Sequence, residues 1–168
     1  YNDRHELTEA NHLDGSHTIF NYDNNGNQVS KSHSPVTLMI WYSNGSNVAQ
    51  QCTLNLDGID VQTVVFAPTG SWSTYNSVSI ALTAEDVQLA VRENDVTANG
   101  GGTGVAIDMF VLLSHAAPKV YEAESMALGG VFAVAEEGAS GGQVALGLGV
   151  DNTQSITINS IPWSGIMP

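Results

Sequence analysis

The sequence has few basic residues and almost no cysteine. Four lysines and arginines stand against 17 aspartates and glutamates, which gives a formal net charge of −13. Such a chain repels nucleic acid and anionic membranes, so we expect neither as a partner. The single cysteine, Cys52, excludes a disulfide within the chain. Because it lies in the strand-like run 49–56, we expect a buried structural thiol.

Signals of membrane insertion and of catalysis are also missing. No apolar stretch is long enough to cross a membrane, and there is no nucleophile elbow, metal-protease helix or phosphate loop. Glu136 and Glu137 are adjacent, so they would face opposite sides of a strand rather than act as a catalytic pair. We therefore expect no enzymatic activity. No signal peptide is visible and the chain begins at Tyr1, which suggests processing and a secreted, extracellular protein.

Polar uncharged residues and turn signals dominate what is present. Charged residues make up only 12% of the chain, and Asn, Gln, Ser, Thr and Gly take their place, which is typical of an all-β domain with many turns. Hydrophobic runs of strand length predict strands at 18–22, 36–42, 49–56, 61–66, 77–82 and 105–113. Residues 83–92 allow either a helix or a hairpin, and we favour the hairpin because the surroundings are β.

The first 34 residues are polar, and we expect them to be irregular apart from the short strand at 18–22. They hold four histidines at spacings that fit no compact metal motif, so we interpret these as loop residues: His5, His12, His17 and His33. The sequon at Asn44 lies on a predicted turn and would be glycosylated only in a eukaryotic secretory setting. Trp41, inside an apolar run, is expected in the core.

Two glutamates one residue apart, Glu122 and Glu124, open the most informative stretch, 121–149. In an extended strand both carboxylates would lie on one face and repel each other. Since basic residues are scarce, a hard cation between them is the more economical interpretation. Asp108 is a lone acid in the apolar run 105–113, and a buried carboxylate needs a partner. A cation shared by all three would supply it. The alternative is a hydrogen-bonded Asp108 and an exposed glutamate pair.

The order of motifs in this stretch resembles a known family. YEAE at 121–124, Gly129-Gly130 and the Ser140-Gly141-Gly142 turn are similar to the opening of carbohydrate-binding modules of families 6 and 35. The earlier half of the chain resembles the second part of the same modules, through WYSNG (41–45), NLDGIDV (55–61), PTGSWSTY (68–75), VSIALTAEDVQLAVRE (78–93) and AIDMFVLL (106–113). The two halves therefore stand in reverse order.

This resemblance implies an all-β, jelly-roll, galactose-binding-like β-sandwich. We divide the chain into an N-terminal extension (1–34), the second half of the motif (35–113), a linker (114–119) and the first half of the motif (120–168). Reversal of the halves means either a circular permutation within one chain or an exchange of half-sandwiches between neighbouring chains, because each half alone would expose edges and half a core. We favour permutation, since the local concentration within one chain promotes self-closure.

The resemblance also implies a structural calcium ion (Ca²⁺) bound by Glu122, Glu124 and Asp108. For the sugar it implies a cleft in the loops at one end of the sandwich, with the aromatic pair Trp72 and Tyr75 and the loop residue Asn99 as carbohydrate-binding candidates. Trp72 is equally compatible with a core position. We expect a non-catalytic glycan or polysaccharide binder. The alternative is a self-associating structural subunit of an extracellular filament, built by exchange between chains.

Overall fold

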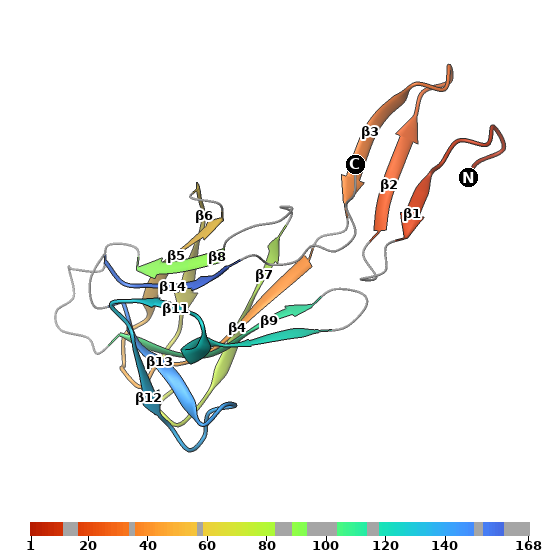
Figure 1. The fold of residues 1–168 in the computed structure, drawn as a ribbon. Helices are drawn as coiled ribbons and strands as arrows, with labels where there is room; N and C mark the ends of the chain where they lie inside the picture. Colours follow the sequence, from red (N-terminus) through yellow and green to blue (C-terminus); the bar gives the residue numbers. More distant parts are fainter. Residues whose placement is uncertain are drawn as a thin grey trace.

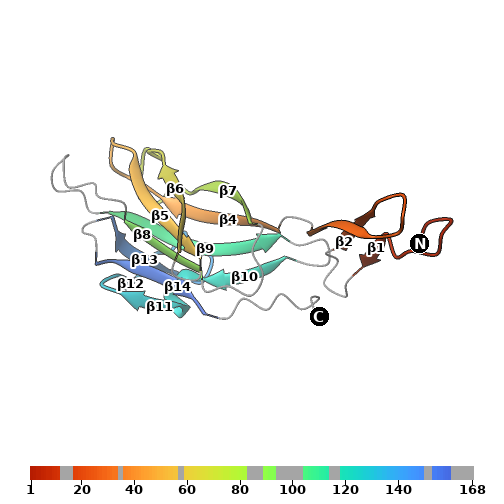
Figure 2. The same ribbon diagram turned by 90° about the horizontal axis from the view of Figure 1, so that it is seen from above.

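The computed structural model describes residues 1–11, 17–33, 36–56, 59–82, 89–93, 104–113, 118–149 and 153–159. Nearly all regular structure in these ranges is β, and the chain forms a β-sandwich of two antiparallel sheets with a third, smaller sheet beside it (Figures 1 and 2). The expected all-β sandwich is thus confirmed. No helix in the described residues is long and apolar enough to span a membrane.

The first sheet of the sandwich has six strands. Its order is β12 (Phe132–Ala135), β13 (Gln143–Leu148), β9 (Val105–Leu113), β4 (Val36–Ser43) and β7 (Asn76–Leu82), and β10 (Lys119–Glu122) also pairs with β9. The second sheet has the order β11 (Ala127–Gly129), β14 (Ser155–Ile158), β8 (Leu89–Glu93), β5 (Gln50–Leu56) and β6 (Ile59–Phe66).

The alternating direction of side chains along a strand sets which of them enter the core between the sheets. In β4, Leu38, Ile40 and Tyr42 are buried at the sheet interface, while the residues between them face outward. Tyr42 meets Phe66 of the opposite sheet with ring centroids 4.8 Å apart and a tilt of 59°. Cys52 is a buried thiol in this core, as expected. Trp41 is not part of it: the alternation turns the indole to the outer face, where its Nε1 donates to Met39 Sδ.

The two halves of the chain interlock within one molecule. Strand β9 of the earlier half pairs with β10 and β13 of the later half, and β8 pairs with β14. In this structure the sandwich therefore closes within a single chain.

The prediction of a hairpin over 83–92 is wrong in the pairing of its strands. Residues 89–93 do form a strand, but β7 and β8 belong to different sheets, so this connection crosses the sandwich; residues 83–88 lie outside the described ranges.

The N-terminal segment is more ordered than its polar sequence indicates. Strands β1 (Glu9–Asn11), β2 (His17–Tyr22) and β3 (Gln28–His33) form a three-stranded antiparallel sheet that lies to one side of the sandwich (Figure 1). The turn at 23–27 was correctly predicted: Gly26 has a φ of +86°, and the Asp23 carboxylate accepts the backbone N–H of Asn25 and Asn27. The expectation of an irregular segment is therefore wrong, because cross-strand pairing orders it.

The sequon asparagine is a buried structural residue. Asn44 has no exposed surface, and its amide group donates to the carbonyl oxygens of Val48 and Phe66 at 2.9 and 3.0 Å. Its backbone also exchanges hydrogen bonds with Thr69, which ties the 43–46 turn to the following loop. A glycan attached to this amide has no room in the folded sandwich, so the turn position alone was misleading.

We expect Asn44→Ala to lower the free energy of unfolding by about 1–3 kcal/mol, because the buried Phe66 carbonyl loses its donor and the Val48 carbonyl loses one of two. Urea unfolding measures this directly. The matched control is Asn47→Ala, an exposed asparagine of the same turn, which should stay within about 0.5 kcal/mol of the parent. Equal stabilities of the two variants would show that the buried amide does not hold the turn.

Candidate functional site

The candidate site is organised around an interruption in the hydrogen-bonded ladder of β9. On one edge of β9, β10 pairs as far as Met109 and β13 begins at Ile107, so Asp108 lies in the gap between them. On the other edge, Trp41 opposes Met109 and Tyr42 opposes Ile107, which makes Asp108 the extra residue of a β-bulge. Bulges re-aim side chains. Here the bulge lets an acid stand in an otherwise apolar strand.

The Asp108 carboxylate is buried and is held by the turn at 136–142. It is 4% exposed, and its Oδ1 accepts the backbone N–H of Ser140 at 2.8 Å. The Ser140 hydroxyl donates to Glu122 Oε1 at 2.9 Å. Ser140 therefore bridges Asp108 of the earlier half and Glu122 of the later half. Burial raises the pKa of Asp108 above its ordinary value of 3.8; the Ser140 N–H opposes this, and the nearby Glu122 and Glu124 carboxylates add to it.

Glu124 joins this cluster by a different route from the one predicted. The strand ends at Glu122, and residues Ala123–Ser125 form the 3₁₀ turn η2, so the two glutamates do not share one strand face. The turn nevertheless brings Glu124 back to the same place. A Cβ on Gly141 would collide with Glu124 Oε1 and lie 3.3 Å from Glu122 Oε2. Both carboxylates thus lie against Gly141, one residue beyond the Ser140 bridge.

Two oxygens of this cluster have no protein partner. Glu122 Oε2 and Glu124 Oε2 are buried and accept no hydrogen bond. A buried carboxylate oxygen without a partner costs free energy. A hard cation satisfies such an oxygen best, because it prefers oxygen ligands. Within the described ranges, no three His, Cys, Asp or Glu side chains already converge tightly enough to hold a metal ion. The donor types fit calcium, and Ser140 bonds both Asp108 and Glu122.

A pocket of about 190 Å³ lies on the outer face of the six-stranded sheet. Its walls are mostly apolar, with one carboxylate, and consist of Trp72, Ala106, Val134, Glu136, Val144 and Leu146. The loop that carries Trp72 is fixed on the 43–46 turn: Ser43 Oγ donates to the Trp72 carbonyl at 2.5 Å. The indole lies flat on Gly45, where an added Cβ would come within 2.5 Å of the ring. Trp72 is therefore a pocket wall rather than a core residue.

Tyr75 is influenced by charged residues of both the pocket and the acidic cluster. Its ring packs near Gly138 of the 136–142 turn, 3.5 Å from where a Cβ would stand. Its hydroxyl is buried and has no hydrogen-bond partner. Burial raises the pKa of Tyr75 to about 12, and the negative charges of Glu136 and Asp108 contribute. The phenol is thus close enough to a carboxylate of the pocket and a carboxylate of the cluster to feel both charges, and it remains neutral at physiological pH.

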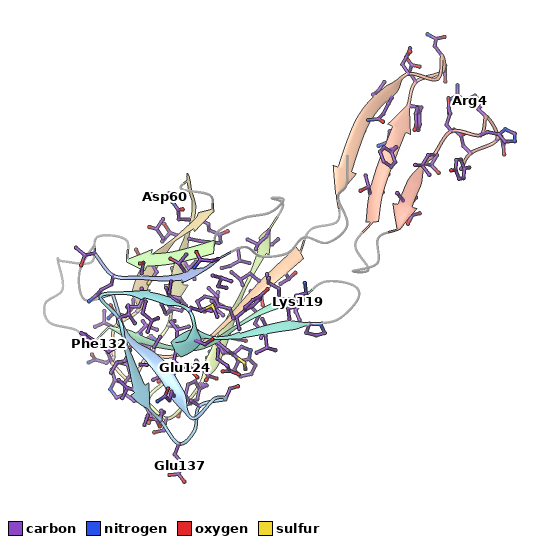
Figure 3. The ribbon with its side chains drawn as sticks, viewed as in Figure 1. Arg4, Asp60, Lys119, Glu124, Phe132 and Glu137 are labelled. Atoms are coloured by element: carbon purple, nitrogen blue, oxygen red, sulfur yellow. The ribbon has the colours of Figure 1, made fainter. Side chains whose placement is uncertain are left out.

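The sequence-predicted residues are thus partly brought together. Asp108, Glu122 and Glu124 meet as one cluster, Tyr75 feels the charge of Asp108, and Trp72 lines the pocket; Asn99 is outside the described residues. Sequence reasoning missed Glu136, Val134 and Leu146, because their contribution depends on how β12 and β13 pair with β9. It also placed the cleft in the end loops, whereas the pocket that Trp72 lines rests on the outer sheet face. Figure 3 shows Glu137, the neighbour of Glu136, pointing away from the sandwich.

We expect Asp108→Asn to change how stability depends on pH in the metal-free protein. The folded pKa of Asp108 is raised, so its carboxyl stabilises the fold when protonated, and this is lost as pH rises through the folded pKa. Relative to the parent, the variant should gain stability as pH rises above the ordinary aspartate pKa of 3.8, since asparagine keeps the oxygen that accepts the Ser140 N–H. Urea unfolding in chelator at several pH values measures it. Parallel curves would contradict the assignment, and Glu137→Gln, an exposed change, is the control.

Comparison with known proteins gives one structural similarity. No protein-family model matches the chain, and no curated protein matches it either. Among solved structures, the chain is similar to one described as "vCBM60 in complex with galactobiose". The two are 17% identical in sequence and superpose with a TM-score of 0.47, over 74% of this chain and 99% of that chain.

Proposed function

We propose that this protein binds carbohydrate without catalysis, through the pocket under Trp72, and that a calcium ion stabilises the site. The observation that carries the proposal is the pocket itself: an indole fixed on a glycine, apolar walls and a single carboxylate. An aromatic face stacks on the apolar face of a pyranose, while carboxylates and phenols bond its hydroxyls. Glu136 supplies such a group in the same pocket as Trp72.

The calcium ion would be held by Asp108, Glu122 and Glu124. Support comes from the two buried carboxylate oxygens without partners, and from the way Ser140 and Gly141 pack against all three side chains. Bound calcium supplies positive charge that offsets the mutual repulsion of these acids. Because Asp108 belongs to one half of the chain and the glutamates to the other, the ion would also fasten the halves together. Their reversed order, in comparison with the modules of families 6 and 35, fits a circular permutation.

The alternative function is an extracellular assembly. In this structure the sandwich closes within one chain, so exchange between chains is not needed to complete the core. The feature that favours assembly is the small sheet β1–β3, which has exposed apolar side chains at Ile19 (41%) and Val29 (61%). We keep secretion and self-association as proposals. Gel filtration at several concentrations distinguishes a stable monomer from an assembling subunit.

Calcium should raise the melting temperature, and excess EGTA should lower it. At a calcium concentration about a hundred times Kd, the gain in unfolding free energy is about 2.7 kcal/mol. Asp108→Ala should remove the response, whereas Glu137→Gln, whose side chain is exposed, should keep it. Calorimetry in calcium and in EGTA measures both. If the parent protein melts at the same temperature in the two solutions, the calcium site is refuted.

Trp72→Ala should abolish measurable glycan binding, because it removes the stacking surface. The test uses isothermal titration with cellohexaose, xylohexaose and a β-1,4-galactan hexamer. Gly45→Ala should also weaken binding, since its Cβ displaces the indole while every polar group of the pocket remains. Val65→Ala, an exposed valine on the other sheet, is the control. Unchanged affinity of Trp72→Ala, in a variant that unfolds like the parent, would rule out this pocket.

A further inference from the structure

The pocket under Trp72 continues along a row of side chains that crosses the six-stranded sheet. Phe132 of β12 lies opposite Leu146 of β13, Leu146 lies opposite Ala106 of β9, and Ala106 lies opposite Ser43 of β4. The neighbouring row contains Ala145, Ile107 and Tyr42, which face the core. Since successive residues of a strand face opposite sides, the row from Phe132 to Ser43 faces outward.

The two ends of this row are aromatic. Trp72 covers the Ser43 end, where its carbonyl accepts the Ser43 hydroxyl, and it lines the pocket together with Ala106. Phe132 stands at the other end and is 71% exposed, although Val131 just before it is buried. Figure 3 shows Phe132 at the edge of the sandwich. Neighbouring strands are about 4.8 Å apart, so β12 and β9 are separated by about 9.6 Å. Between the two rings lies the apolar floor of Leu146 and Ala106.

Phe132 is not part of the buried core among the described residues. Its strand, β12, is an edge strand whose four residues are all exposed. The Phe132 ring adjoins the apolar wall of the pocket through Leu146, and a contiguous exposed apolar surface of this kind marks a contact site. The row itself carries no charge from Phe132 to Ser43. The ligand that matches it is uncharged, has apolar faces for both rings, and is longer than one pyranose.

We propose that Phe132 forms a second sugar-stacking position, so that the site binds a neutral oligosaccharide of at least two pyranose rings across β12, β13 and β9. This inference rests on the proposed function and adds its ligand length and a residue. One ring of the sugar lies in the pocket against Trp72, with Glu136 near its hydroxyls. A following ring lies over Leu146 and reaches Phe132. Affinity therefore increases with chain length because the second ring gains its own stacking partner.

The test compares Phe132→Ala with the parent by isothermal titration. The probes are cellohexaose, xylohexaose and the β-1,4-galactan hexamer, each together with its monosaccharide and disaccharide. For a sugar that the parent binds, we expect the variant to lose about tenfold in affinity for the disaccharide and the hexamer, with no change for the monosaccharide. Phe132→Tyr should restore binding, whereas Phe132→Leu should not, because leucine keeps apolar surface without a ring face.

The controls separate the two proposals. Val120→Ala removes a 53% exposed side chain from β10 of the same sheet, away from the row, and should have no effect. If the parent binds hexamers and Trp72→Ala abolishes binding while Phe132→Ala does not weaken it, the second position is overturned and the pocket stands. If the parent binds none of the sugars, both proposals fail. If Phe132→Ala instead converts a dimer to a monomer in gel filtration with unchanged sugar affinity, Phe132 is a contact between copies and the inference is wrong.

Discussion

Repulsion between three carboxylates is the constraint on which this sandwich depends. Asp108, Glu122 and Glu124 come from separate segments, and the fold gathers them under one turn with almost no basic side chain in the sequence to balance them. Ser140 donates two hydrogen bonds to the cluster, yet two buried oxygens, Glu122 Oε2 and Glu124 Oε2, have no partner. Buried carboxylate oxygens without partners cost free energy, and a cation bound there, as proposed, would link the site to the stability of the fold through the same residues.

The bulge at Asp108 explains why the cluster can exist there at all. A residue in a regular ladder would have its backbone bonded on both sides and its side chain fixed to one face. Asp108 has no paired residue on either edge of β9. On one edge it falls in the gap between β10 and β13, and on the other it lies at the register shift against β4. The same gap lets the chain leave β10 into η2, which returns Glu124 to the cluster. A local irregularity in one strand thus positions groups from both halves of the chain.

The sequence predicted what depends on local pattern and failed where register decides. Apolar runs of strand length were sufficient for the strands at 36–42, 61–66 and 77–82, because length and composition are local properties of the sequence. The acid cluster was also predictable, although for a partly wrong reason: Glu124 reaches it through a 3₁₀ turn rather than a strand face. Phe132 and Glu136 gave no local signal. Their place beside Trp72 follows from the pairing of β12, β13 and β9, which no spacing in the sequence specifies.

Tyr75 senses both the cluster and the pocket through charge. Its hydroxyl is buried without a hydrogen-bond partner, and this burial and the negative charges of Glu136 and Asp108 all raise its pKa. A change in charge at Asp108 therefore alters the electrostatic potential at this phenol. If the proposed cation and the proposed sugar both bind, any coupling between them must be reciprocal, because each ligand then changes the affinity of the other by the same factor.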